Sequence, residues 1–243
     1  MSRSLLYLYE DTENQRLTMA GVTLADFLVM NPINRPLIVS GGKFEQARQS
    51  LRTRFSYLEP HELKSFVASQ DVEKQPITAI DVRSLQTLDT LTDVEIAEIL
   101  FLMHMKRGMP SPFLKSVQNE IAYFSEKNGA HSFLYLRHWE QLEQAVAKLL
   151  RHKLVIESKL SHIEPVIPEV VRKLRAMLPS GILIDLDKIS RSIFSRQLTL
   201  PIYVAGRYED MEVLSEDFEA GKESIVKRGA LIYRKKNWIF EVE

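Results

Sequence analysis

One segment in the middle of the chain is committed to a helix by its apolar pattern. Its large apolar side chains recur at intervals of three and four residues: Trp139, Leu142, Val146, Leu149 and Leu150. This spacing places them on one face of an amphipathic helix. We therefore predict a helix over residues 139–152. It extends toward His162, because no glycine or proline intervenes before Pro165.

Further helices are predicted by similar spacing and by end signals. Thr92 and Glu95 form a capping box, in which a hydroxyl and a carboxylate satisfy free amides at a helix start. This box opens a helix that we expect to end near Lys106. The other predicted helices cover residues 23–30, 44–55, 60–67 and 168–178.

Short aromatic and β-branched runs predict strands at both ends of the chain. Residues 4–9 and 15–19 flank a polar stretch and predict a β-hairpin, and residues 231–233 and 238–242 predict a second one. The other predicted strands are 36–40, 77–82, 182–186, 198–204, 211–214, 224–227 and 230–234.

The stretch from Pro112 to Lys127 has two interpretations. Helical spacing of its apolar residues fits one helix over 112–127. Alternatively, a short helix ends near Gln118 and residues 120–125 pair with 132–136 as a hairpin around Asn128-Gly129. We favour the hairpin, because aromatic residues gather on both sides of that turn and aromatic residues prefer strands.

These elements predict an α+β protein. It has a mixed α/β N-terminal segment, a helical middle and a β-rich C-terminal region. We divide the chain into a lobe over residues 1–90 and a lobe over residues 91–243. A single domain is the alternative, since no linker marks the boundary.

Composition excludes several classes of protein. Lysine plus arginine and aspartate plus glutamate are equal at 32 each, so no net charge steers polyanions from a distance. The absence of cysteine excludes disulfides, thiolate nucleophiles and cysteine-based metal sites. The start, MSRSLLYLYEDTENQ, does not resemble a signal peptide, and no apolar run approaches the roughly 20 residues that span a bilayer. We expect a soluble cytoplasmic protein that does not bind membranes.

The first candidate site is an anion site at Ser40, Gly41, Gly42 and Lys43. These residues follow a predicted strand and precede a predicted helix. Glycines let the backbone approach an anion, and a helix N-terminus offers it free amides. The pattern lacks the longer glycine loop of a P-loop and the third glycine of a dinucleotide fingerprint. A tight strand-to-helix turn is the alternative.

The second candidate is a metal site at Asp185 and Asp187. Two residues apart on a strand, both carboxylates point to one face, where such a pair can hold Mg²⁺. The alternative is a solvated strand end or the cap of a helix over residues 188–194. The six histidines form no metal-binding pair, and we predict no cofactor.

The third candidate is a charged interaction surface near the C-terminus. Seven acids lie between Glu209 and Glu223, and a basic group follows directly: Lys227, Arg228, Arg234, Lys235 and Lys236. Segregated charges of this kind suit a protein partner. The alternative is a solvated acidic loop beside a basic edge strand, whose lysines discourage strand pairing.

Another basic group accompanies residues 150–196: Arg151, Lys153, Arg172, Lys173, Arg175, Arg191 and Arg196. Together with the helices and hairpin over residues 92–136, it suggests a winged-helix nucleic-acid binder with its wing at Lys127-Asn128-Gly129. The recognition helix would then be Pro112 to Gln118. It offers only Lys115 as a cation, which makes nucleic acid the less favoured partner.

No catalytic motif is present, so the first functional hypothesis is a non-enzymatic regulatory or protein-interaction protein. The partner would be another protein that binds the C-terminal charges. The first alternative is an enzyme or small-molecule binder that uses the anion site at residues 40–43, and the second is the winged-helix nucleic-acid binder. The sequence does not define an oligomeric state.

Overall fold

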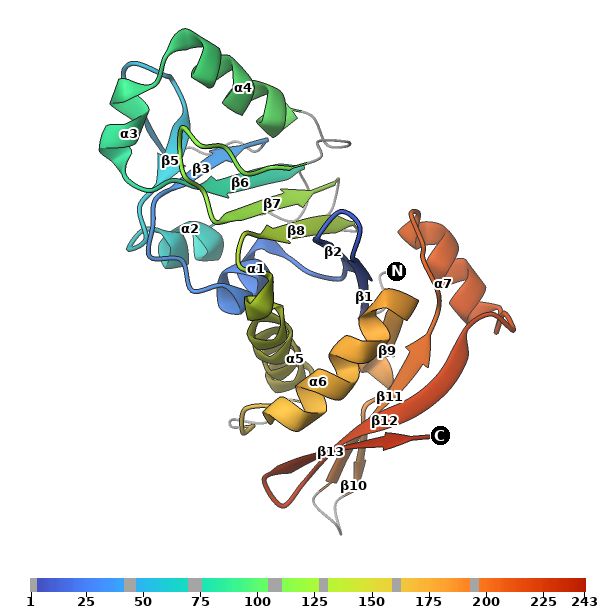
Figure 1. Ribbon diagram of the computed structural model, residues 1–243. Helices are drawn as coiled ribbons and strands as arrows, with labels where there is room; N and C mark the ends of the chain where they lie inside the picture. The colour runs from blue at the N-terminus through green and yellow to red at the C-terminus, as the bar shows by residue number, and fades with distance from the viewer. Residues whose placement is uncertain are drawn as a thin grey trace.

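The strand nearest the N-terminus lies inside the sheet, with the two halves of the protein on either side of it. The computed structural model describes residues 4–41, 47–69, 76–104, 111–126, 131–158, 163–192 and 197–243 (Figure 1). All strands within these residues join one antiparallel sheet of thirteen strands, in the order β13-β12-β11-β9-β1-β2-β8-β7-β6-β3-β5-β4, with β10 beside β11. The protein is therefore a mixed α+β fold dominated by its sheet.

The strands are β1 (Leu5–Asp11), β2 (Arg16–Ala20), β3 (Leu37–Ser40), β4 (Arg48–Gln49), β5 (Ser56–Leu58), β6 (Ile77–Asp81), β7 (Ile121–Ser125), β8 (Ser132–Leu136), β9 (Ile182–Asp185), β10 (Ser190–Ser192), β11 (Gln197–Val204), β12 (Val226–Arg234) and β13 (Asn237–Val242). The α-helices are α1 (Leu24–Met30), α2 (Leu63–Ser69), α3 (Leu85–Thr90), α4 (Asp93–His104), α5 (Leu142–Ser158), α6 (Pro168–Met177) and α7 (Met211–Glu219).

Alternation along the strands gives the sheet two different faces. In β1, Leu6 and Leu8 point to the main core, which we call the first face, whereas Tyr7 and Tyr9 point to the second face. Helices α1, α2, α5 and α6 cover the first face and bury its leucine, isoleucine and valine side chains in one continuous core.

The second face is covered only toward its two ends. Helices α3 and α4 pack against residues of β3, β6, β7 and β8, and α7 packs against residues of β1, β9 and β11. Figure 1 shows α4 and α7 well apart, with β8 and β2 between them. The middle of the second face is therefore free to carry polar side chains.

A buried ion pair joins α1 to α5. Thr23 and Asp26 form a capping box at the start of α1, and the Asp26 carboxylate accepts hydrogen bonds from the Thr23 backbone N–H and hydroxyl. The same carboxylate lies 2.6 Å from Lys153 Nζ and 3.6 Å from His152 Nε2 on α5. Because Asp26 is almost fully buried, the pair fixes how α1 docks on α5.

Several sequence expectations are confirmed. The hairpins β1–β2, β7–β8 and β12–β13 are present, so the hairpin interpretation of residues 120–136 is correct. Thr92 and Glu95 make the predicted capping box, and α4 runs from Asp93 to His104. The predicted amphipathic helix is a short 3₁₀ turn, Trp139–Gln141, that leads into α5.

Three element predictions are wrong. In place of a helix over residues 44–55, the described part from residue 47 forms a small hairpin of β4 and β5 at the sheet edge. Leu51, which fits the helical spacing, is 88% exposed in its turn. Residues 211–214 begin α7 and not a strand, because Asp210 caps the helix by accepting from Glu212 and Val213 N–H. The helix over 188–194, offered as the alternative to a metal site, is absent from its described part, where residues 190–192 form β10 and residues 193 and 194 lie outside the described residues.

The predicted recognition helix is also absent. Residues 112–118 form an extended segment and a turn, which Asn119 holds by accepting from Leu114 N–H and donating to Pro112 O. Side-chain hydrogen bonds of asparagine compete with helix formation in this way. The predicted wing at Lys127-Asn128-Gly129 lies outside the described residues, and nucleic-acid binding stays a prediction that has no recognition helix at residues 112–118.

The structure is dominated by one sheet and is not clearly divided into the predicted mixed segment, helical middle and β-rich end. Strands β7 and β8 continue the sheet through the predicted helical middle, and β6 pairs with β7 across the predicted lobe boundary near residue 90. The division into two lobes stays a prediction. No helix in the described ranges has both the length and the apolar character needed to cross a bilayer.

We predict that Asp26→Ala lowers the free energy of unfolding by about 3–5 kcal/mol, measured by urea denaturation. The change leaves half-buried Lys153 without its carboxylate and removes the Asp26 half of the capping box of α1. The control is Lys173→Ala, which breaks the exposed pair with Glu169 and should cost no more than about 0.5 kcal/mol. Equal losses in the two variants would contradict the role of the buried pair.

Candidate functional site

Polar side chains lie across the uncovered middle of the second face in two cross-strand rows. The register pairs Tyr9 of β1 with Thr18 of β2, and Thr18 with Phe133 of β8. The next row on this face pairs Asp11 with Arg16, and Arg16 with Tyr135. Because side chains of residues directly opposite each other lie close together, the rows form a continuous floor over β1, β2 and β8.

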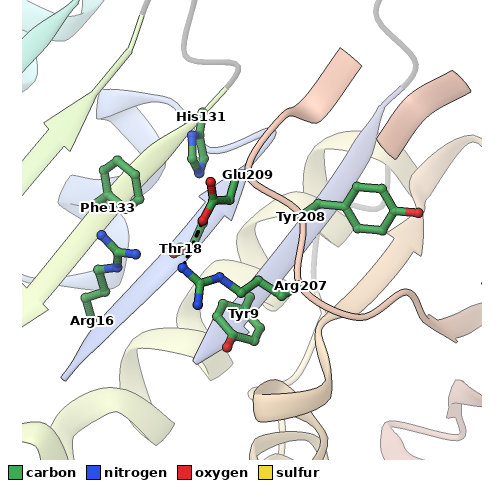
Figure 2. Close-up of a pocket in the computed structure, with 8 residues that line it drawn as sticks. All are labelled: Tyr9, Arg16, Thr18, His131, Phe133, Arg207, Tyr208 and Glu209. Carbon is green, nitrogen blue, oxygen red and sulfur yellow. Dashed lines mark hydrogen bonds and ion pairs between the residues drawn. The ribbon is translucent and has the colours of Figure 1, made fainter. Parts of the chain in front are cut away.

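A small cavity of about 130 Å³ lies on this floor (Figure 2). Tyr9, Arg16, Thr18, His131 and Phe133 belong to the sheet side. The remaining lining residues, Arg207, Tyr208 and Glu209, come from the segment between β11 and α7. We call this cavity the central pocket. It has the volume of roughly four liquid water molecules and so accommodates a small group rather than a large ligand.

Tyr7 holds the 206–208 segment over the floor. Its hydroxyl donates to Gly206 O at 2.8 Å and accepts from Tyr208 N–H at 3.0 Å. Burial raises the pKa of Tyr7 to about 12, so the hydroxyl stays protonated and able to donate. Gly181 allows this close approach: its φ is +66°, and a Cβ there would lie 2.0 Å from Gly206 O.

Two arginines bring positive charge to the central pocket. Arg16 Nη2 lies 3.2 Å from Asp11 Oδ2, and its guanidinium carbon lies 4.7 Å from the centre of the Phe133 ring. Arg16 Nε is buried and has no hydrogen-bond acceptor within the described part of the chain. A buried donor without an acceptor is costly, so Arg16 keeps hydrogen-bonding capacity that its pair with Asp11 does not use.

The second arginine, Arg207, pairs with a carboxylate of its own segment. Arg207 Nη2 lies 2.9 Å from Glu209 Oε1. Burial alone would lower the pKa of Arg207, but Tyr9, Glu209 and Asp11 raise it above its usual value. Figure 2 shows the Glu209 side chain reaching toward the space between Arg207 and His131. The Glu209 carboxylate thus lies where a carboxylate from outside would meet the same cation.

His131 lies at the upper side of this space in Figure 2. The side chain is 8% exposed, its ring centre lies 4.5 Å from that of Phe133, and Nδ1 lies 3.7 Å from Glu126 Oε2. The lining therefore combines two guanidiniums, which donate hydrogen bonds and accept none, with hydroxyl and imidazole groups, which can donate as well as accept. Glu209 is its one carboxylate. This chemistry suits a ligand rich in acceptor oxygens.

The predicted anion site lies at a different place. Ser40 ends β3 and Gly41 follows it with a φ of +104°, whereas Gly42 and Lys43 lie outside the described residues. The described chain resumes at residue 47 without the expected helix, so no helix N-terminus is seen to face this turn. Anion binding at Ser40–Lys43 stays a prediction.

Asp185 and Asp187 hold a turn at the end of β9. Asp185 is buried, accepts a hydrogen bond from Asp187 N–H and lies 3.6 Å from Lys188 Nζ. Asp187 accepts from Ser4 N–H. Strands β1, β2, β8, β7 and β6 separate this pair from Ser40, a distance of about 29 Å at roughly 4.8 Å per strand. The two predicted sites therefore do not converge on one pocket.

No trio of histidine, aspartate or glutamate side chains in the described ranges is arranged to hold a metal ion. Metal binding by Asp185 and Asp187 stays a prediction.

The predicted interaction surface is split by its own hairpin. Lys227 and Arg228 lie near the start of β12, whereas Arg234, Lys235 and Lys236 lie at the β12–β13 turn. Lys227 and Arg234 are seven positions apart along an extended strand, about 24 Å. Lys227 also pairs with Glu243. Binding of a protein by these five residues stays a prediction, and its partner would have to span the length of the hairpin.

The sequence carried part of the signal for the central pocket. The sequence predicts a hairpin of residues 4–9 and 15–19, and in the structure this hairpin pairs Tyr9 with Thr18 and Asp11 with Arg16 on one face. Two further facts come only from the tertiary structure. One is that β8 lies beside β2, and the other is that residues 207–209 return over the floor.

Comparison with protein-family models, with curated proteins and with solved structures gives no match to this chain. Its function is therefore inferred from the residues themselves.

We predict that Tyr7→Phe lowers the free energy of unfolding by about 1–3 kcal/mol, because Gly206 O and Tyr208 N–H both lose their partner. Urea denaturation measures the loss, and amide exchange at Tyr208 should accelerate. The control is Tyr57→Phe, whose hydroxyl makes no hydrogen bond within the described residues, with an expected change within about 0.5 kcal/mol. Unchanged exchange at Tyr208 would refute the anchoring role of Tyr7.

We predict that Asp11 makes the fold sensitive to acid. Burial alone would raise the pKa of Asp11, but hydrogen bonds from Asn14 and the charges of Arg16 and Arg207 lower it below its ordinary value of 3.8. A carboxyl group with a lowered pKa stabilises the fold above that ordinary value and loses this effect as the pH falls through the lowered pKa.

The test is the pH dependence of Asp11→Asn. Wild type should exceed this variant in free energy of unfolding at pH 6, and the difference should shrink as the pH falls below 3.8. Glu13→Gln, which removes an exposed acid from the same turn, serves as the control for a lost surface charge. A difference for Asp11→Asn that is constant from pH 6 to pH 3 would contradict the prediction.

Proposed function

We propose that this chain is a ligand-binding protein whose central pocket takes a small oxyanion, a carboxylate or phosphate group on its ligand. The observation that carries the proposal is that two guanidinium side chains, Arg16 and Arg207, line the same small cavity, where Glu209 is the one carboxylate among the described lining residues. Guanidinium donors bind carboxylate and phosphate oxygens through charge-assisted hydrogen bonds.

Other lining residues offer ring surfaces and hydroxyl groups that could orient a bound ligand. Tyr9 and Phe133 offer ring surfaces, and Thr18 and Tyr9 offer hydroxyl groups beside the two cations. Glu209 pairs with Arg207 in the ligand-free chain, so an incoming anion would compete with an internal carboxylate for that cation. The sequence also suggested a small-molecule binder with an anion site, at residues 40–43. The anion proposed here would bind elsewhere, because β8 of the pocket floor is three strand positions from β3, where residues 40–43 begin.

The test is a titration with acetate, succinate and inorganic phosphate, followed by NMR shifts of the arginine Nε–H groups and by thermal stability. We expect at least one probe to shift Arg16 and Arg207. Arg207→Gln should weaken its binding about tenfold or more, since a hydrogen bond to a charged group contributes roughly 1.5–3 kcal/mol. Glu209→Gln should strengthen it, because the internal competitor is gone.

The matched control is Arg234→Gln, which removes an exposed arginine at the β12–β13 turn. It should leave the affinity unchanged. Absence of a shift for all three probes, or equal weakening by Arg207→Gln and Arg234→Gln, would overturn the proposal.

A further inference from the structure

A second cationic site lies at one end of the sheet, away from the central pocket. Strands β8, β7, β6 and β3 are neighbours and antiparallel. The end of β8, the start of β7, the end of β6 and the start of β3 therefore meet at the same edge. Residues that flank these strand ends are gathered there from four distant parts of the sequence.

These flanking residues line a broad, shallow cavity of about 670 Å³: Arg35, Arg83, Lys115, Gln118, Glu120 and Arg137. We call it the basic dish. Four of the six carry positive charge and one carries negative charge. Its volume falls within the ~300–1,000 Å³ of typical small-molecule sites, whereas the central pocket is far smaller.

The three arginines are held in place by one short segment, residues 118–120. Arg35 Nη1 donates to Gln118 O at 3.1 Å, and Arg83 Nη1 donates to the Gln118 side-chain oxygen at 2.9 Å. Arg137 Nε donates to Asn119 O at 2.9 Å. Gln118 itself adopts the left-handed region, with a φ of +49°. The guanidiniums are thereby ordered before any ligand arrives, which lowers the entropic cost of binding.

Buried Asp81, at the end of β6, holds this segment through its carboxylate. Its Oδ1 accepts hydrogen bonds from Glu120 N–H at 2.8 Å and Ile121 N–H at 2.6 Å, and its Oδ2 lies 3.3 Å from Arg35 Nη1. Asp81 is 2% exposed, so its carboxylate is occupied inside the protein. Arg137 is supported separately, with its guanidinium carbon 4.9 Å from the centre of the Phe113 ring.

The dish keeps uncompensated positive charge. Glu120 pairs with Arg35, but within the described ranges no carboxylate lies in ion-pair distance of Arg83, Lys115 or Arg137. Each guanidinium has five N–H donors; the internal bonds use three of them in Arg35 and one each in Arg83 and Arg137. Several fixed donors around a net positive hollow suit a ligand with several negative charges and many acceptor oxygens.

We propose that the basic dish binds a small molecule that carries two or more phosphate groups. Arginine recognises phosphate through paired N–H donors, and three separate arginines with one lysine match a chain of phosphates better than a single one. This site goes beyond the proposed function, since it shares no lining residue with the central pocket.

The test is calorimetric titration of the full chain with tripolyphosphate and with orthophosphate. We expect tripolyphosphate to bind at least tenfold more tightly than orthophosphate, with an affinity that falls as salt is added. Arg83→Gln with Lys115→Gln should weaken tripolyphosphate binding at least tenfold. Both residues are exposed, and the bonds that Asp81 makes stay intact, so the fold is expected to survive.

The matched control is Lys235→Gln with Lys236→Gln, which removes two exposed cations from the β12–β13 turn. ATP distinguishes the source of the phosphates. If ATP binds as tightly as tripolyphosphate, the site recognises the phosphate chain alone. If ATP binds more tightly, the site also contacts the nucleoside. Both results support the proposal.

Four results would overturn it. The first is that tripolyphosphate does not bind, and the second is that the Lys235 and Lys236 control pair weakens its binding as much as the Arg83 and Lys115 pair does. The third is that Arg207→Gln abolishes tripolyphosphate binding while the Arg83 and Lys115 pair does not. The fourth is that a single-stranded oligonucleotide binds although tripolyphosphate does not. The third result would place the anion in the central pocket, so failure here is distinct from failure of the proposed function.

Discussion

The hydrogen bonds on the two sides of β1 hold the sheet together. On one side β1 pairs with β2, which continues to β8 and the strands that follow it, and on the other side it pairs with β9, which continues to β11 and the C-terminal hairpin. The strand order offers no second connection between these two groups. Along β1, Leu6 and Leu8 point to the first face, and Tyr7 and Tyr9 point to the second. A shift of one residue in the pairing of β1 would exchange the side chains of the two faces, so this alternation fixes the register with both neighbouring strands.

Unequal coverage of those two faces creates the central pocket. The first face buries a continuous apolar core under four helices, where an unpaired polar side chain would be costly. The second face is covered by α3 and α4 at one end and by α7 at the other, and between them Thr18 and Arg16 lie beside Tyr9 beneath the 206–209 segment. The basic dish has a different origin, because it is built from strand ends rather than from a strand face.

Local signals in the sequence predicted local structure well. Capping residues and hairpin patterns identified α4, β1–β2 and β12–β13, since each depends on residues only a few positions apart. Prediction failed where tertiary pairing overrode local spacing, as in the helical pattern of residues 44–55, whose described part from residue 47 holds the edge strand β4 and the turn that leads to β5. The sites were harder still. Arg83, Gln118 and Arg137 carry no motif, and only the antiparallel neighbours β6, β7 and β8 bring them to one edge.

The place of β1 in the sheet also sets the order in which the protein can be assembled. Leu5 pairs with Asp185, so ribosomes that add about 5–20 residues per second need roughly ten to forty seconds between making one partner and the other. During that interval the apolar edge of β1 has no native strand to bond, and such edges readily pair with other chains. During synthesis the chain therefore passes through a period in which this unpaired edge of β1 is open to pairing with other chains.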